Sequence, residues 1–278
     1  KAQNYRNLFY PEKGFMWARD ANGKWRDNFD ATEWGGPFTE GCSWHWTWSV
    51  FHDPEGLSTL LGGHEQMAER LDSMFTAPNT FNYGTYGFVI HEIAEMVALN
   101  MGQYAHGNQP VQHAIYLYNY VGQPWKAQYH TRNVLNKLYN SGPQGYCGDE
   151  DNGQTSAWYV CSAMGFYPVC PGQPEYVLGA PLFQKVTLNL PNNKAFVIDA
   201  RNKNDKNLYI DSAKLNGKKF TRNYLTHDEI SSGGELSLKM NAKPNMKRGV
   251  RPEDFPYSYS VYKSVPRSGT PKFRIPNS

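Results

Sequence analysis

The chain has 278 residues, a formal net charge of +3 and charged side chains at 19 % of its positions. Its Lys and Arg residues are spread along the sequence, so neither nucleic acid nor an anionic membrane surface is indicated as a partner. No apolar run approaches the ~20 residues that a transmembrane helix needs. Aromatic residues reach 15 %, and because Trp and Tyr rings stack on sugars as well as in cores, carbohydrate binding is one interpretation of this composition.

The first 38 residues place Pro and Gly between aromatic residues and predict irregular structure. Beyond them, apolar residues recur at helical spacing in five segments. These segments are 57–75, 89–101, 111–120, 124–139 and 155–164. Pro110 and Pro124 suit the first turns of helices, and Gly122 lies just past a helix end. Helices of this length, joined by long loops, predict part of a helical barrel or toroid.

After Pro171 the apolar pattern changes to short alternating runs separated by Asn-Asn, Asn-Gly and Gly-Gly turns, as in β-hairpins. These runs are 176–179, 185–190, 195–200, 208–210, 213–217 and 235–240. They predict a β-sandwich or a large antiparallel sheet over about 175–242. Residues 250–278 contain five prolines and predict a tail that lies on another surface. The fold class is therefore α+β, with a helical portion over 1–174 and a β-strand region over 175–278.

The cysteines and the first residues bear on the chemistry of the thiols and on whether the sequence is a fragment. The four cysteines form no CxxC pair, which argues against zinc or thioredoxin-like chemistry and favours free thiols. The sequence begins at Lys1 without an initiator Met or a signal peptide, which we interpret as a fragment of a longer protein.

Two acidic clusters stand inside uncharged, aromatic-rich stretches, at 39–46 and 148–154. Glu40 is followed by Trp44 and Trp46, so we expect a partly buried carboxyl that can donate a proton, beside rings that can hold a sugar. Asp149 and Asp151 lie in a polar, Gly-flanked loop and should stay ionised, able to activate water or help to bind a cation. A separated acid and base are typical of glycoside hydrolysis. The alternative is that these acids cap helices or lie on surface loops.

Five strings make a resemblance specific. They are GFMWARDANGKW, FTEGCSWHWTWSVFHDPEGL, YAHGNQPVQHAIYLYNYVGQPWKAQ, GYCGDEDNGQTSAWYVCSAMGFYPVCPG and YVLGAPLF. In this order and spacing they resemble the C-terminal half of glycoside hydrolase family ninety-two, the inverting, calcium-dependent exo-α-mannosidases. The resemblance implies an (α/α)6 barrel with C-terminal strands, a mannose-containing oligosaccharide as substrate, and a periplasmic or secreted location. It also implies that an N-terminal β-sandwich domain, which supplies part of the site in the family, is missing from this chain.

Site residues follow from the resemblance position by position. Glu40 matches the general acid in the family's E-G-x-x-W string, and Asp149 and Asp151 match the pair assigned to the general base, with Asp151 the better candidate. Asn108, Gln109 and Asp151 are the implied calcium ligands, since carboxylate and amide oxygens suit this cation. Many members carry Glu at the position of Gln109. The alternative for residues 106–110 is an ordinary polar helix start.

Three further residues are candidates for substrate binding. His91 and Glu92 resemble the pair used at the leaving-group subsite by members that cleave α-1,2-linked mannose, although an amphipathic helix surface explains them equally well. An HExxH zinc motif is absent here, because Glu95 stands at its last position. Asp53 either orients a substrate hydroxyl or caps the helix that begins near Pro54.

Two rival functions remain at this stage. One is a non-catalytic carbohydrate-binding or scaffold protein that uses the same aromatic surface; the presence of both acid and base argues against it. The other is an α/α-toroid glycosidase or lyase acting on another polysaccharide, which would share the helices but not the ordered strings.

Overall fold

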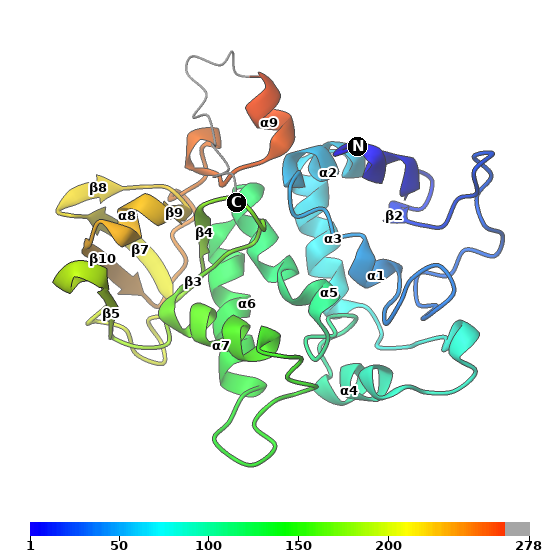
Figure 1. Ribbon diagram of the computed structural model, residues 1–278, viewed down its shortest axis with the longest axis horizontal. Helices are drawn as coiled ribbons and strands as arrows, with labels where there is room; N and C mark the ends of the chain where they lie inside the picture. Colours follow the sequence, from blue (N-terminus) through cyan, green and yellow to red (C-terminus); the bar gives the residue numbers. More distant parts are fainter. Residues whose placement is uncertain (265–278) are drawn as a thin grey trace, which may run out of the picture.

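The computed structural model describes residues 1–264 and places a helical part beside two small sheets (Figure 1). The helical part contains seven α-helices and three 3-10 segments among the described residues up to 164. The α-helices are α1 (Ser43–Trp46), α2 (Pro54–Leu61), α3 (His64–Thr76), α4 (His91–Leu99), α5 (Gln109–Gln112), α6 (Pro124–Lys137) and α7 (Gln154–Met164). The 3-10 segments are η1 (Asn4–Leu8), η2 (Gly84–Tyr86) and η3 (Ala114–Tyr120).

The predicted helices are confirmed as helical regions, but two of them differ in detail. The segment 57–75 is interrupted by Gly62 and Gly63, which have φ of +101° and +118° and end α2 before α3 begins. The segment 111–120 is α-helical only in its first turn and then continues as η3, all of whose residues are buried. A helix buried on every face gives no amphipathic signal, so its backbone type could not be read from periodicity.

Two sheets contain most of the strands. The larger has the order β5 (Lys185–Leu190), β6 (Lys194–Asp199), β10 (Gly234–Asn241), β7 (Tyr209–Leu215) and β8 (Lys218–Phe220). The smaller has the order β3 (Phe166–Tyr167), β4 (Glu175–Leu178) and β9 (Tyr224–Thr226). A short N-terminal hairpin pairs β1 (Phe9–Tyr10) with β2 (Phe15–Met16). The expectation of a wholly antiparallel sheet is wrong, because β10 pairs parallel with β6.

Strand boundaries also differ from the expectation. The runs predicted at 208–210 and 213–217 form one strand, β7, and β8 and β9 were not anticipated. Helix α8 (His227–Ser231) was missed as well, although Thr226 and Glu229 form a capping box at its start.

Two buried clusters correspond to the two parts of the chain. One lies in the helical part of the chain and includes Trp34, Trp48 and Trp158, which are all fully buried. The other joins the inner faces of both sheets, with Phe166 and Leu225 from the smaller sheet and Phe196 from the larger. Hydrogen bonds cross between the parts, for example from Arg132 Nη1 to the Pro181 carbonyl at 2.7 Å.

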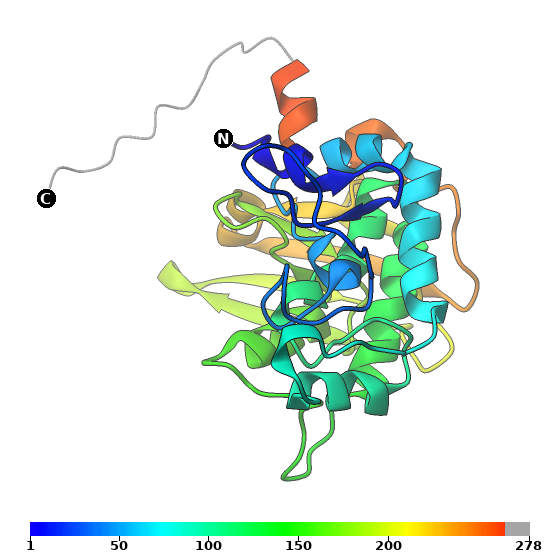
Figure 2. The same cartoon turned by 90° about the vertical axis from the view of Figure 1, so that its right-hand side faces the viewer.

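The C-terminal segment returns to the helical part. It contains η5 (Pro252–Asp254) and α9 (Tyr259–Ser264), and α9 packs on α2 near the N-terminus (Figure 2). The prediction that the tail lies on another surface is confirmed for this portion, and its remainder, 265–278, is outside the described residues. All four cysteines are free thiols, as expected. Within residues 1–264 no helix is long and apolar enough to cross a membrane.

After α4 the chain passes close to the end of α3, and Gly102 is the residue at this close contact. Its φ is +63°, and a Cβ built there would lie 2.4 Å from the Met74 carbonyl oxygen. Gly87 has a similar φ of +74° but nothing within 4 Å of such a Cβ. We expect Gly87→Ala to cost about 1 kcal/mol of unfolding free energy from backbone strain alone. Gly102→Ala should cost about 1–3 kcal/mol more, from overlap with backbone. Equal losses in urea denaturation would contradict this packing.

Candidate active site

Glu40 lies just before α1 in a backbone conformation that is rare for a residue with a side chain. Its φ is +47°. Its N–H donates to the Tyr86 hydroxyl at 2.8 Å, and its carbonyl accepts from Asn108 Nδ2 at 2.8 Å. These bonds hold a left-handed residue that would otherwise cost roughly 1–2 kcal/mol. Such over-determined strain is common at functional sites, and here it fixes where the Glu40 side chain leaves the backbone.

Asp151 is placed by the turn that leads into α7. Asp151, Asn152 and Gly153 have successive φ values of +56°, +55° and +99°. The neighbouring Glu150 is used locally, since its Oε2 accepts from the Gly153 N–H at 2.8 Å and its Oε1 accepts from the Ser156 N–H at 3.2 Å. Hydrogen bonds from Ser156 and Gly153 lower the pKa of Glu150. Glu150 therefore caps α7, and the exposed Asp151 carboxylate is directed elsewhere.

Glu40 and Asp151, far apart in the sequence, line the same cavity of about 780 Å³. A smaller cavity of about 370 Å³ adjoins it and shares Glu40, Phe51 and Gln109. The other residues of the larger cavity are His113, Gln154, Tyr167, Pro168, Val169 and Pro171. Among the described residues that line the two cavities, Glu40 and Asp151 are the carboxylic acids. The site thus has a single pair of acids in a cleft of ligand size.

Asp149 does not join this pair. It lies in a different cluster with His91 of α4, whose Nε2 is 3.9 Å from Asp149 Oδ2. His91 also contacts Glu92 Oε1 at 3.3 Å and Glu95 Oε1 at 3.2 Å. The hydrogen bond to Glu95 is the main cause that raises the pKa of His91. Of the two aspartates expected beside Glu40, the structure therefore brings only Asp151 to it.

The His91 cluster has the spacing of a possible metal site, since ligand atoms of His91, Glu95 and Asp149 lie within 4.8 Å of one another. An imidazole with carboxylates suits zinc or a similar ion better than calcium. Glu95 was missed as a site residue, although its i, i+4 spacing from His91 was visible in the sequence. One oxygen each of Glu92 and Glu95 is buried without a hydrogen-bond partner among the described residues.

The three residues expected to hold calcium fit unequally. Asn108 is buried, its Oδ1 accepts from the Gln109 N–H at 3.1 Å, and its Nδ2 faces Glu40. Asn108 thus has a positioning role as the N-cap of α5, and its Oδ1 keeps a second lone pair, so its role as a calcium ligand stays a prediction. Gln109 donates through Nε2 to Asp151 Oδ2, which leaves Gln109 Oε1 and the Asp151 carboxylate as oxygen donors on the cavity wall. These are ligands of the hard type that calcium prefers.

The two tryptophans after Glu40 have different surroundings. Trp46 lines the smaller cavity, donates from Nε1 to the Thr39 carbonyl at 3.0 Å and stacks on Phe38. Trp44 packs edge-on against Phe15 and lines neither cavity, because residues two apart in a helix do not share a face. The structure therefore places Trp44 away from both cavities, and its role in substrate binding stays a prediction.

The expected partial burial of Glu40 is wrong, because its residue is exposed in this chain. Glu40 reaches open solvent at the same cavity wall where Trp46 lies, without being enclosed by it.

Asp53 is not a substrate ligand, and the capping alternative is the correct one. It is fully buried and is the N-cap of α2, accepting from the Gly56 N–H at 3.2 Å. Its other hydrogen bonds come from Tyr5 and from Ser258 and Ser260. Its oxygens are thus occupied in joining both ends of the chain to α2.

Sequence reasoning missed Tyr86, Phe51 and His113. Tyr86 contacts Glu40 through a fold-dependent hydrogen bond, for which the sequence carries no signal. His113 lines the larger cavity, and its Nε2 bonds to the Trp48 carbonyl at 2.7 Å. Burial lowers the pKa of His113 to about 4, so the ring is neutral at physiological pH. Phe51 and His113 both stand inside the strings on which the resemblance rests.

Comparisons with known proteins identify the family of this chain. Residues 1–242 match the glycosyl hydrolase family 92 catalytic domain. The inverting mannosidase BT2199 of Bacteroides thetaiotaomicron is 76 % identical, with a TM-score of 0.82 over 93 % of this chain and 35 % of that one. The α-mannosidase BT3965 of the same organism is 36 % identical, with a TM-score of 0.81 over 92 % and 32 %.

A curated relative from Arthroderma benhamiae, described as an uncharacterized secreted glycosidase, is 29 % identical over 222 residues, which are 79 % of this chain and 26 % of that protein. The chain thus spans about a third of the length of the two solved mannosidases and about a quarter of the secreted relative. With a family match over most of its residues, the chain belongs to glycosyl hydrolase family 92.

Proposed function

We propose that this chain carries the acid and the base of an inverting exo-α-mannosidase. The observation that supports this most is that Glu40 and Asp151 line the same cavity. Both residues also have a left-handed backbone conformation. The name of the 76 % identical BT2199, an inverting mannosidase, supports the same reaction. Mannan or N-glycans are the proposed substrates, and the secreted relative supports a secreted or periplasmic location.

In this proposal Glu40 donates a proton to the glycosidic oxygen as the bond to the anomeric carbon breaks. Asp151 accepts a proton from a water that attacks the same carbon from the opposite face. The two carboxyls should then lie about 6.5–9.5 Å apart, leaving room for the water, where a retaining pair would be at about 5 Å. This separation stays a prediction for a sugar-bound crystal structure.

We propose that the residues around His91 bind the leaving-group sugar and give specificity for α-1,2 linkages. His91 and Glu92 lie at the start of α4, and Asp149 Oδ2 is 3.9 Å from Nε2 of the same imidazole. His91 carries a raised pKa, so the ring can donate to a hydroxyl while the carboxylates accept from others. Asp149 in this role binds substrate and does not act as the base.

Stereochemistry tests the proposal directly. When this chain, joined to the N-terminal domain that the family resemblance implies, is mixed with α-1,2-mannobiose, proton NMR should show β-mannose before α-mannose, because water attacks opposite the leaving group. Release of the α-anomer first would contradict inversion. Binding of the disaccharide without any release, by this chain joined to the N-terminal domain that the family resemblance implies, would instead identify a carbohydrate-binding protein and refute the enzymatic proposal.

Calcium dependence is proposed through Gln109 and Asp151. A bound calcium ion would supply positive charge for two mannose hydroxyls and ease distortion of the ring. We expect chelation to reduce turnover and added calcium, but not magnesium, to restore it, because magnesium resists irregular oxygen coordination. In calorimetry, Gln109→Glu should bind calcium more tightly than the unaltered chain, and Gln109→Met more weakly. Full activity in excess chelator would remove calcium from the proposal.

A further inference from the structure

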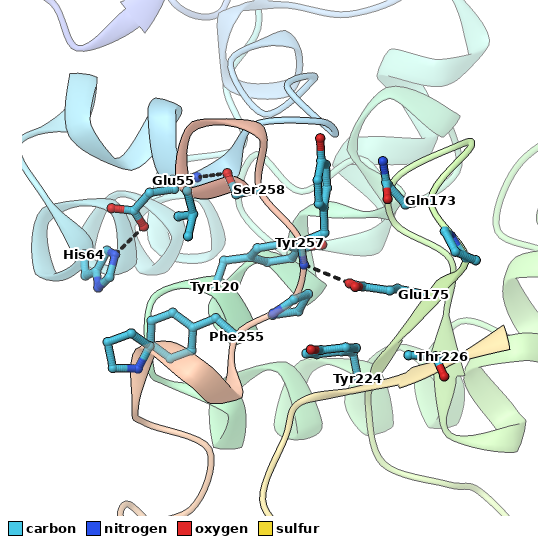
Figure 3. A pocket seen from close by; sticks show the side chains of 14 residues that line it. Glu55, His64, Tyr120, Gln173, Glu175, Tyr224, Thr226, Phe255, Tyr257 and Ser258 are labelled. Carbon is cyan, nitrogen blue, oxygen red and sulfur yellow. Dashed lines mark hydrogen bonds and ion pairs between the residues drawn. The ribbon is translucent and has the colours of Figure 1, made fainter. Parts of the chain in front are cut away.

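A second cavity of about 540 Å³ lies where α2, α3, the smaller sheet and the C-terminal segment meet (Figure 3). Figure 3 shows Glu55 and His64 on one side of it and Gln173, Glu175 and Thr226 on the other. The remaining lining residues are Tyr120, Pro174, Tyr224, Pro252, Phe255, Pro256, Tyr257, Ser258 and Val261. Its volume falls within the ~300–1,000 Å³ of small-ligand sites.

Residues that line this cavity are neighbours in sequence of residues that line the candidate active site. Residues 167–171 form part of the wall beside Glu40 and Asp151, and residues 173–175 form part of the wall of the second cavity. One short segment therefore contributes to both cavities, and a ligand at one borders the segment that lines the other.

Two polar groups face this cavity without full hydrogen bonding. Tyr120 is only 3 % exposed, yet its hydroxyl has no hydrogen-bond partner among residues 1–264. Glu175 accepts the Tyr257 N–H through Oε2 at 2.8 Å, and no bond within the described part of the chain reaches its Oε1. Both groups therefore remain available to hydrogen-bond a ligand that has hydroxyls. A purely apolar ligand would leave them unsatisfied.

One of the two carboxyls that line the cavity already has a partner. The Glu55 carboxylate is paired with His64 Nε2 at 2.6 Å, and this hydrogen bond raises the pKa of His64. Burial raises the pKa of Glu175, which favours its uncharged form. The aromatic rings of Tyr224 and Phe255 form partly exposed walls of the cavity.

We propose that this cavity binds a neutral sugar, with the C–H face of a pyranose against Phe255 and Tyr224 and its hydroxyls on Tyr120 and Glu175. Aromatic walls with a few convergent hydrogen-bonding groups are the arrangement that suits a pyranose. The identity of the sugar as mannose rests on the proposed function; the cavity itself takes no part in bond cleavage. Such a site would hold a second portion of an oligosaccharide, or a second chain, beside the catalytic cleft.

Methyl NMR of the full chain can separate the two sites. In the Glu40→Gln background, which prevents turnover, an α-linked mannotriose is titrated to about 20 mM, since weak sugar sites have millimolar dissociation constants. Val169 lines the catalytic cleft and reports on it, whereas Thr226 and Val261 line the second cavity. We expect the methyl signals of Thr226 and Val261 to shift with their own saturation curve.

Matched variants identify the contacts. Tyr120→Phe removes only the hydroxyl and should weaken binding reported by Thr226 about fivefold. Phe255→Ala should weaken it about tenfold, and Tyr129→Phe, an exposed tyrosine of α6, should leave it unchanged. Unmoved Thr226 and Val261 signals, or equal effects of Tyr120→Phe and Tyr129→Phe, would overturn the proposal. If only the methyl signals of Val169 shifted, the second sugar site would be refuted and the catalytic proposal would be unaffected.

Discussion

Replacing Glu40 by Gln in the full-length enzyme should lower kcat for α-1,2-mannobiose by about 10³-fold, because an amide of the same shape cannot protonate the departing sugar. On an aryl α-mannoside with an acidic phenol the loss should be much smaller, since that leaving group departs without a proton. The backbone bonds of Glu40 to Tyr86 and Asn108 do not involve its side chain, so the fold should be unaffected.

Steady-state kinetics on both substrates provide the measurement. Glu69→Gln, the same change at an exposed position of α3, is the control and should leave both rates unaltered. An equal loss on the two substrates would show that Glu40 is not the proton donor.

Replacing Asp53 by Ala should destabilise the chain by about 3 kcal/mol or more, because each buried donor left without its acceptor costs about 1–3 kcal/mol. Five donor groups, the hydroxyls of Tyr5, Ser258 and Ser260 and the N–H groups of Gly56 and Ser260, would lose this carboxylate. Urea denaturation gives the free energy, and Asp27→Ala, at a side chain that is 76 % exposed, is the control. A loss at Asp53 no larger than at Asp27 would contradict the role of this carboxylate.

The same residue predicts a pH effect. Burial by itself would raise the pKa of Asp53, but hydrogen bonds from Ser260, Tyr5 and Ser258 outweigh it, and the pKa is lowered in the folded chain. A lowered folded-state pKa gives stability that is present above the unfolded value of about 4 and is lost as the pH falls through the folded value. In Asp53→Asn, the stability difference between pH 7 and pH 3 should therefore be smaller than in the unaltered chain.

The sequence predicted the order of elements better than their connections. The helices at 124–139 and 155–164 follow clear 3.6-residue periodicity and appear as α6 and α7 nearly as expected. The parallel pairing of β6 with β10 was not foreseen, because strand partners depend on how distant segments meet and the alternating pattern is the same for both directions. The short strands β8 and β9 carry too few residues to show alternation.

For the site, local motifs placed Glu40 and Asp151 in one cavity but could not give their surroundings. Whether Asp149 accompanies Asp151 depends on three consecutive left-handed residues at 151–153, two of which are not glycine. Trp44 and Asp53 were both candidates for substrate binding, yet Trp44 packs on Phe15 and Asp53 accepts hydrogen bonds from Tyr5 and Ser258. Contacts of this kind arise from tertiary structure, which residue type and spacing do not encode.

The position of β10 has a consequence for how the chain is assembled. This strand lies at the centre of the larger sheet, with β6 on one side and β7 on the other, although it is the last of the five to be synthesised. Until residues 234–241 emerge from the ribosome, β5–β6 and β7–β8 are two separate hairpins, each with an unsatisfied inner edge. Such edges readily pair with other chains, and long-range strand pairing closes slowly. A nascent or truncated chain ending before Gly234 would be prone to aggregate, so the order of translation leaves this half of the molecule exposed until its final strand arrives.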